Sequence, residues 1–371
     1  MIKRRKFQKI GFICTSLDNM AGGLERQIVR TCNELTNEGY RVTLFSYDSE
    51  NAKSFYEIDQ RVKWIKCGCN LKPHTSAPLV SRLRQIYFLR QKLLKESITC
   101  LVSFHHGIFP RSFLASIFTN IKLVVSERNA LSNYKFIKLS KFNLGFLSLF
   151  LSHKITVQID TYKNDYPALL RSRIITIPNL IKKPNKEYQK PNLSASIISM
   201  MGRLSEQKNF TPLLDQISSL TFKEDHNMKI FIAGEGDLRK SIERNYSDLI
   251  KDSILQLKGT IKDTDLFLSN SSIFCFPSLW EGYPNALVEA IRIGLPIVTT
   301  HRMAHLTSFV ENKVNGLIVS DSELLNAIIY LLNNPLLMLE MSINSFSKYQ
   351  KLYKESSINN WIKLFNSIQK R

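Results

Sequence analysis

Two glutamates, Glu281 and Glu289, stand in the segment EGYPNALVEA, separated by seven residues. The segment follows the apolar run 273–276, and Pro284 with Asn285 indicates a helix start, so we expect Glu281 in the loop and Glu289 one turn inside the helix. Carboxylates hold sugar or ribose hydroxyls, and a helix N-terminus suits a pyrophosphate. The alternative interpretation is an amphipathic helix with one buried glutamate.

Two cations, Arg203 and Lys208, follow the predicted strand 196–201. Fixed cations in this position can stabilise the negative charge that develops on a departing diphosphate. Glycines Gly22 and Gly23 follow the first strand, and Gly234 follows strand 229–233. Glycine lets a backbone approach phosphates closely, although a plain tight turn explains the Gly-Gly pair equally well. The loop at Gly234 lacks the full G-x-G-x-x-G pattern, which disfavours a nicotinamide site.

Two histidines, His105 and His106, follow the strand 100–104, and Arg128 follows the strand 122–126. The carboxyl ends of parallel strands are the usual place for ligands. We expect both groups to face a cleft, with His106 preferred over His105, although a histidine pair at a domain rim is otherwise ordinary surface.

These segments resemble family 4 of the glycosyltransferases. The matches are Glu281-Gly-Tyr-Pro with Glu289-Ala, Gly202-Arg-Leu with Lys208-Asn, and Gly22-Gly-Leu-Glu-Arg. The resemblance implies an α/β fold of GT-B type, with two Rossmann-like parallel-sheet domains facing a central cleft. It also implies donor-binding roles for Gly22, Gly23, Arg203, Lys208, Gly234, Glu281, Asn285, Ala286 and Glu289.

The resemblance further implies catalytic roles for Arg203, Lys208, Glu281 and His106, and an acceptor side at His105, His106 and Arg128. A histidine is common at the second strand end in this family, where this chain has Glu127 and Arg128. The resemblance implies that the acceptor attacks on the face from which the diphosphate departs, and that the diphosphate takes the acceptor's proton. We therefore expect retention of configuration with no metal and no cofactor, the nucleotide diphosphate sugar being a substrate.

Strands alternate with helices on both sides of a polar segment at 182–192 that holds two prolines. We predict an N-terminal acceptor and membrane-facing domain at 1–180 and a C-terminal nucleotide-sugar domain at 181–345. Residues 346–371 are predicted to form a helix that returns to the first domain.

Positive charge is concentrated in the first half of the chain. The net charge is +20; residues 1–180 carry 28 basic and 12 acidic side chains, hence +16, and the remainder carry 23 and 19, hence +4. Such a field attracts nucleic acid or an anionic membrane leaflet. No nucleic-acid-binding motif is present, so we expect a membrane surface and no nucleic acid.

The predicted helix 79–96 carries a basic-apolar face, and the stretch 134–151, with Lys135, Lys138 and Lys141, is a second candidate for membrane contact. On a helical wheel, one side of the helix 79–96 is apolar and contains Leu79, Leu83, Ile86, Tyr87, Leu93 and Leu94. No export signal or spanning segment is evident, which predicts a cytoplasmic protein held peripherally at the inner face of the membrane.

The expected function is retaining transfer of a hexose or N-acetylhexosamine, from a UDP-sugar in preference, to a lipid-linked oligosaccharide in surface polysaccharide biosynthesis. One alternative keeps the donor site and uses a soluble small-molecule acceptor. The other, of a different class, is a non-catalytic protein that binds a nucleotide sugar or a polyanion. The oligomeric state is left open.

Overall fold

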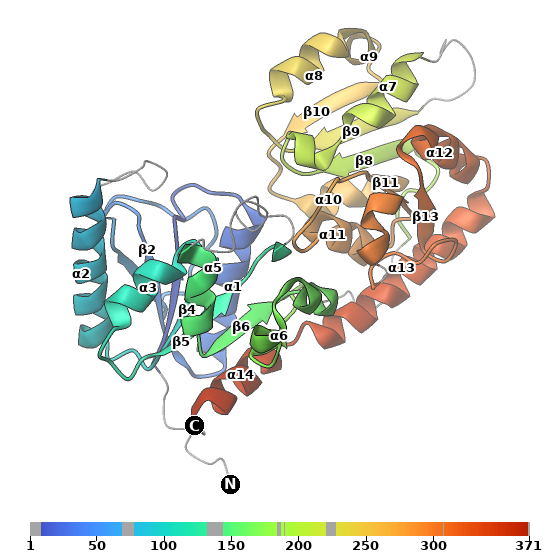
Figure 1. Cartoon of the computed structure of the whole chain (residues 1–371). Coiled ribbons are helices and arrows are strands. Elements are labelled where there is room, and N and C mark those ends of the chain that lie inside the picture. Colours follow the sequence, from blue (N-terminus) through green and yellow to red (C-terminus); the bar gives the residue numbers. More distant parts are fainter. Residues whose placement is uncertain are drawn as a thin grey trace. The chain divides into compact units, whose positions relative to one another are not determined.

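The computed structural model describes residues 9–68, 78–131, 144–183, 187–188, 190–219, 228–306 and 308–369. The chain forms two compact units (Figure 1). Unit 1 comprises Met1–Leu180 with Ser356–Arg371, and unit 2 comprises Ile181–Glu355. The stretch 134–151 lies partly outside the described residues, and its three lysines fall there.

The centre of unit 1 is a parallel sheet in the order β3-β2-β1-β4-β5-β6-β7. Its middle strands are short apolar runs, buried on both faces as a parallel sheet covered by helices requires. The strands are β1 (Lys9–Cys14), β2 (Arg41–Ser46), β3 (Lys63–Lys66), β4 (Cys100–Phe104), β5 (Lys122–Ser126), β6 (Lys154–Val157) and β7 (Ile174–Thr176).

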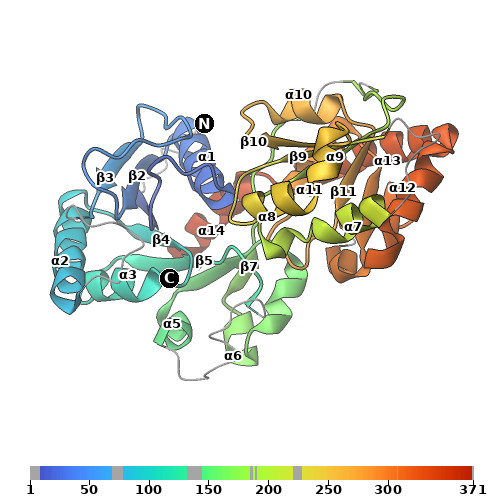
Figure 2. The same ribbon diagram turned by 90° about the horizontal axis from the view of Figure 1, so that it is seen from above.

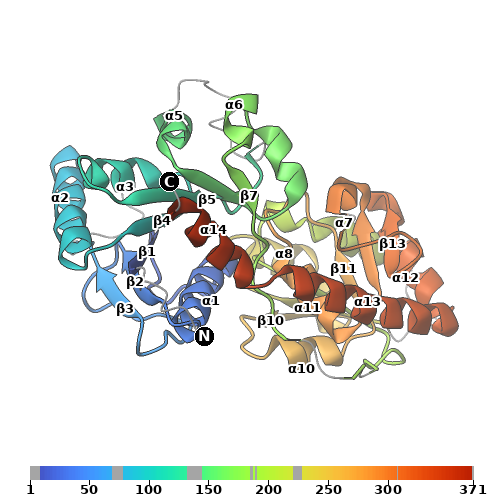
Figure 3. The same ribbon diagram turned by 90° about the horizontal axis from the view of Figure 1, so that it is seen from below.

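Helices follow most of these strands, as right-handed β-α-β crossovers demand. They are α1 (Gly23–Asn37), α2 (Leu79–Lys95), α3 (Phe109–Ser116), α5 (Leu144–Ser148), α6 (Ala168–Arg171) and α14 (Asn359–Gln369). The last of these comes from the end of the chain and lies across the unit 1 sheet (Figure 3). Trp361 of α14 is buried and packs edge-on against Phe12 of β1, which anchors this segment in the unit 1 core.

Helix α2 lies alongside α3 at one side of unit 1 (Figure 2). It buries Gln85, Leu89 and Leu93 at a spacing of four residues. Leu93 is predicted from the sequence to lie on the apolar side that contacts a membrane, but it is buried. The buried side of α2 is the one that also contains Gln85 and Leu89. Five large apolar side chains remain exposed on α2: Leu79, Val80, Leu83, Tyr87 and Leu94.

Unit 2 is built on a second parallel sheet in the order β10-β9-β8-β11-β12-β13. Its strands are β8 (Ile197–Met201), β9 (Lys229–Ala233), β10 (Leu255–Gly259), β11 (Ile273–Phe276), β12 (Ile297–Thr300) and β13 (Gly316–Val319). Helices on its two faces are α7 (Thr211–Ser219), α8 (Arg239–Asn245), α9 (Ser247–Lys251), α10 (Thr264–Ser269), α11 (Asn285–Ile293), α12 (Leu324–Leu332) and α13 (Pro335–Glu355).

The predicted α/β class with two parallel-sheet domains is confirmed. The segment that returns to unit 1 starts at Ser356, whereas the sequence pattern suggests 346. The difference arises because α13 continues without a break to Glu355 and buries Ser345, Tyr349 and Leu352 within unit 2.

Among the described residues no single helix is long and apolar enough to cross a membrane. One bent pair, Asp321–Leu332 with Pro335–Gln369 at 104°, passes the same test of length and composition. Several of its apolar side chains, such as Leu324 and Ile328, belong to the core of unit 2.

Candidate functional site

In unit 2, the loop after β8 and the loop after β11 meet through an ion pair. Lys208 Nζ donates to Glu281 Oε1 at 2.5 Å, and the two side chains are only 15 % and 8 % exposed. The ammonium also lies 5.8 Å from the centre of the Phe276 ring at the end of β11. The fold thus joins two predicted site residues that are 73 positions apart in the sequence.

Close backbone approach at two glycines makes room for this pair. Gly202 has φ +154°, and a Cβ there would lie 2.7 Å from Lys208 Cε. Gly234 has φ +140°, and a Cβ there would lie 1.9 Å from the Gly202 carbonyl oxygen. At Gly202 the Lys208 side chain would have to move and the backbone has a φ that L residues rarely adopt, whereas at Gly234 the backbone itself would have to move. The loops after β8 and β9 therefore need glycine where they touch.

Three hydrogen bonds attach the β8 loop to the β11 loop. Gln207 Nε2 donates to the Trp280 carbonyl at 2.8 Å, and the Leu279 amide donates to the Gln207 carbonyl at 2.8 Å. Asn209, which has a left-handed backbone, donates from Nδ2 to the Pro277 carbonyl at 3.2 Å. These bonds fix the position of the loop that carries Lys208 relative to the loop that carries Glu281. Arg203, which precedes this segment, is exposed.

Helix α11 begins at Asn285, directly after Pro284, so Glu289 lies one turn inside it. No side chain caps this N-terminus, and the first-turn amides, including that of Ala286, have no acceptor one turn earlier in the helix. Burial raises the pKa of Tyr283, whose ring packs edge-on against Phe309. A protonated, buried tyrosine here is part of the core that supports the helix start.

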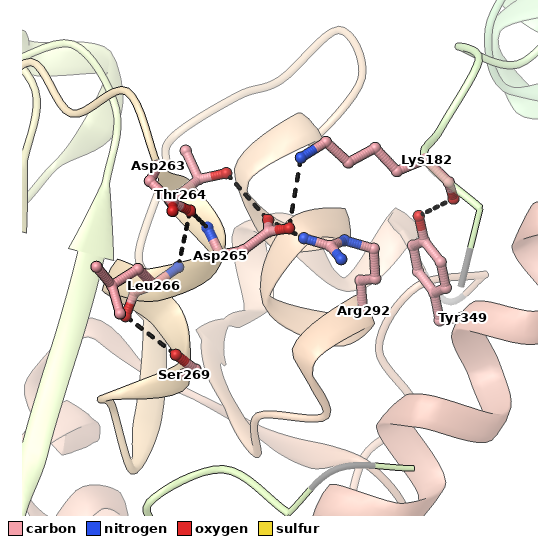
Figure 4. Close-up of polar contacts among 8 residues, drawn as sticks. All are labelled: Lys182, Asp263, Thr264, Asp265, Leu266, Ser269, Arg292 and Tyr349. Atoms are coloured by element: carbon pink, nitrogen blue, oxygen red, sulfur yellow. Dashed lines mark hydrogen bonds and ion pairs between the residues drawn. The ribbon is translucent and has the colours of Figure 1, made fainter. Parts of the chain in front are cut away.

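The opposite end of α11 is anchored by a polar cluster (Figure 4). Buried Arg292 of α11 contacts Asp265 of α10, and the same carboxylate lies 3.4 Å from Lys182 Nζ. Asp263 caps α10 by accepting from the Asp265 amide at 3.1 Å. Tyr349 of α13 donates to the Lys182 carbonyl at 2.6 Å. Both ends of α11 are therefore fixed within unit 2.

In unit 1, Gly22 and Gly23 stand at the start of α1. Gly22 has an ordinary φ of −76° and is the N-cap residue, without a side-chain cap. A Cβ at Gly22 would meet only the flexible carboxylate of Glu25, at 2.1 Å. The backbone at this position does not itself require glycine.

His106 and Glu127 form a buried pair at the carboxyl ends of β4 and β5. His106 Nδ1 lies 2.9 Å from Glu127 Oε2, and the side chains are 6 % and 0 % exposed. The His105 ring lies beside that of His106, with centroids 4.1 Å apart. Burial, with a smaller contribution from His106, lowers the pKa of His105 to about 4, so His105 is neutral near pH 7.

Arg128 is held at the same edge of the sheet. Its guanidinium lies 3.7 Å from the centre of the Phe104 ring and donates to Asn179 Oδ1 at 2.9 Å and to Ser126 Oγ at 2.7 Å. Asn179 also accepts from Gln158 Nε2 at 3.3 Å. This arrangement gives Arg128 a defined position on an aromatic face.

The structure thus brings together Lys208 with Glu281 in unit 2, and His105 with His106 in unit 1. Sequence reasoning missed the pairing of His106 with Glu127, although the adjacency of strands 100–104 and 122–126 in the chain was a usable signal. It also missed Phe104 and Asn179 as partners of Arg128. Within the described part of the chain, no group of three or more His, Cys, Asp or Glu residues could hold a metal ion.

Residues 181–350 match the family model of the glycosyl transferases group 1. Among solved structures, a TarM variant from Staphylococcus aureus, in complex with fondaparinux, α-GlcNAc-glycerol and UDP, superposes with a TM-score of 0.76. It is 15 % identical, and the match covers 97 % of this chain and 100 % of that one. This likeness identifies the fold as GT-B.

Two curated relatives extend the comparison to the whole chain. An uncharacterized glycosyltransferase of Haemophilus influenzae is 28 % identical over 95 % of this chain and 99 % of its own length. A Campylobacter jejuni enzyme, named as an α-1,4-N-acetyl-D-galactosaminyltransferase acting on a GalNAc-containing diNAcBac-PP-undecaprenol, is 24 % identical over 84 % of each chain. Residues 181–350 therefore belong to the glycosyl transferases group 1, and the chain is a glycosyltransferase of GT-B fold.

Proposed function

We propose that this enzyme transfers a hexose or N-acetylhexosamine from a UDP-sugar to a lipid-linked oligosaccharide during assembly of a surface polysaccharide. The observation that carries the donor half is the contact of Lys208 with Glu281 at 2.5 Å. It joins a cation suited to a diphosphate with a carboxylate suited to sugar hydroxyls, beside the uncapped start of α11.

Each donor residue has a distinct role in this proposal. Arg203 and Lys208 hold the diphosphate and stabilise the negative charge that grows as it leaves. Glu281 holds sugar hydroxyls and Glu289 the ribose. Asn285 and Ala286, at the start of α11, are proposed to lie beside the phosphates, and glycine at positions 202 and 234 lets the loops after β8 and β9 approach each other closely.

The reaction needs no covalent enzyme intermediate. The acceptor hydroxyl attacks the anomeric carbon on the face that the diphosphate leaves, the new glycosidic bond forms, and the departing phosphate oxygen takes the hydroxyl proton. The two cations take the place of a metal ion. His106, with His105 and Arg128 of unit 1, is proposed to contact the acceptor.

A lipid-linked acceptor is supported by the named acceptor of the Campylobacter relative. It also suits the exposed apolar residues of α2, which alternate with the exposed cations Arg82, Arg84 and Lys95. Each cation near an anionic leaflet contributes about 1 kcal/mol to binding. We propose that this surface, the α2 face, rests on the inner leaflet of the cytoplasmic membrane.

The acceptor is tested by incubating the enzyme with labelled UDP-, GDP- and dTDP-sugars and membranes that contain lipid-linked precursors. We expect label from a UDP-sugar in the organic phase, and its rate of appearance should be about 100-fold lower with the Lys208→Ala variant. Label found only in a small water-soluble saccharide would instead support the soluble-acceptor alternative. Binding of nucleotide sugar without transfer to any acceptor would support the non-catalytic one.

The α2 face is tested by sedimentation with vesicles. The wild type should bind anionic but not neutral vesicles, and binding should decline as salt rises. The double variant Leu83→Gln/Tyr87→Gln should bind about 10-fold more weakly, because it removes two exposed apolar side chains. Leu336→Gln, at a similarly exposed leucine of unit 2, is the matched control. Equal binding by all three proteins would contradict this surface.

A further inference from the structure

The buried pair of His106 and Glu127 is not explained by folding alone. Glu127 has 1 % of its surface exposed, and among the described residues its Oε1 atom has no hydrogen-bond partner. Burying a carboxylate with one oxygen unsatisfied destabilises a fold, so such groups are usually kept for another reason. We propose that Glu127 is a positioning residue, which fixes the ring of His106 so that its Nε2 atom accepts a hydrogen bond from a substrate hydroxyl.

The backbone sets both side chains in place. His105 has φ +110°, and its amide donates to the Ser126 carbonyl at 3.0 Å, which ties the end of β4 to the end of β5. The Glu127 amide donates to the Thr156 carbonyl of β6 at 2.9 Å. The histidine and the glutamate are thus held by three adjacent strands, and the 2.9 Å contact does not depend on a mobile loop.

The contact dictates the histidine tautomer. An ionised carboxylate can only accept, so Nδ1 of His106 carries a proton and donates it to Glu127 Oε2. In a neutral imidazole the other nitrogen, Nε2, is then a hydrogen-bond acceptor. A sugar hydroxyl is a matching donor, whereas a second acceptor such as a phosphate oxygen is not.

The residues next to this pair in the chain, His105 and Arg128, have defined positions of their own. His105, whose ring is 4.1 Å away, is itself neutral near pH 7. The Arg128 cation bonds to Asn179 and Ser126 and stacks on Phe104.

This inference rests on the proposed function, because it requires that His106 faces a substrate. The test compares kcat/KM for transfer in Glu127→Gln, His106→Ala and the double variant. An amide in place of the carboxylate can donate to Nδ1 and move the ring proton to Nε2. We expect Glu127→Gln to lower kcat/KM by about 10-fold in the wild-type background and to have no further effect in the His106→Ala background.

A spectroscopic readout separates this role from a structural one. The ¹⁵N shifts of the His106 ring should report protonated Nδ1 in the wild type and a shift toward protonated Nε2 in Glu127→Gln. Glu127→Asp keeps the charge and should retain the wild-type tautomer, which covers the case that the glutamine variant does not fold. Ser103→Ala in β4, which removes a buried 2.9 Å hydrogen bond to Ser112 of α3, is the control and should change neither readout.

The proposal would be overturned by an equal loss from Glu127→Gln with and without His106, or by an unchanged tautomer in that variant. Full activity of His106→Ala would also overturn it. Failure of the proposed function is distinguishable, because it would appear as absence of transfer to lipid by the wild type while the tautomer change persists.

Discussion

The two strand-end clusters are built by different means. In unit 2 the β8 and β9 loops touch through backbone at Gly202 and Gly234, and an ion pair with three hydrogen bonds joins the β8 loop to the β11 loop. In unit 1 the edge is a network of buried side chains, with His106 on Glu127 and Arg128 on Asn179. A backbone contact demands particular residues at fixed positions in a short motif. A side-chain network can be assembled from many strands, and so it leaves little trace in any one segment.

The largest expected effect is on catalysis in unit 2. Arg203→Ala and Lys208→Ala should each lower the rate of transfer by about 100-fold or more, the scale for removal of one preorganised charge-stabilising group. Steady-state rates with the preferred nucleotide sugar measure this. Rates equal to that of the wild type would remove both residues from the proposed site.

The free energy of unfolding should differ between Lys208→Ala and Arg203→Ala. Lys208 is largely buried against Glu281, so its loss should lower the free energy of unfolding by about 1–3 kcal/mol. Arg203 is exposed, and its loss should change that energy by less than about 0.5 kcal/mol. Denaturant titration of both variants measures the difference, and equal destabilisation would contradict the ion pair.

Substitution of one glycine in each unit tests whether the backbone there requires glycine. Gly234→Ala should destabilise unit 2 by about 2 kcal/mol or more, because its Cβ would overlap the Gly202 carbonyl at a positive φ. Gly22→Ala should leave stability within about 0.5 kcal/mol of the wild type, because only a flexible side chain must move. Thermal unfolding measures both. A stable Gly22→Ala that binds donor more weakly would support close approach of a phosphate there.

A smaller effect is expected at the glutamates. Glu281→Gln and Glu289→Gln should each weaken donor binding by about 10-fold, since a hydroxyl loses a charge-assisted hydrogen bond. Calorimetric titration with the nucleotide sugar measures it. Glu235→Gln, at an exposed glutamate of the same unit that pairs with Arg239, is the control. Unaltered affinity and rate in both variants would mean that the motif is structural.

The smallest effect is a pH dependence in unit 1. The pKa of His105 is about 4 in the folded protein and about 6.5 unfolded, so the unfolded chain takes up a proton first as the pH falls. Stability from the neutral ring is complete above pH 6.5 and is lost on acidification toward pH 4. Between pH 6.5 and 5.5 this amounts to about 1 kcal/mol. His105→Asn, which suits the positive φ, should reduce the loss; an unchanged pH profile would contradict the assignment.

The sequence alone determined the alternation of strands and helices, and with it two parallel sheets. It also located the start of α11 at Asn285, because proline and an apolar repeat act within a few residues. The donor candidates could be named for the same reason: Arg203 with Lys208, and Glu281 with Glu289, each lie within one short segment. Features of this kind depend on steric and hydrogen-bonding interactions between residues that are close in the sequence.

Tertiary structure decided what depends on distant segments. It paired Lys208 with Glu281 and His106 with Glu127, and it buried Leu93 of α2 while leaving Leu94 exposed. It also extended α13 to Glu355, because a buried face on unit 2 continues past the predicted boundary. These outcomes depend on which strand ends and helix faces meet in space, and the energy of such contacts depends on distance and burial, which no spacing along the chain records.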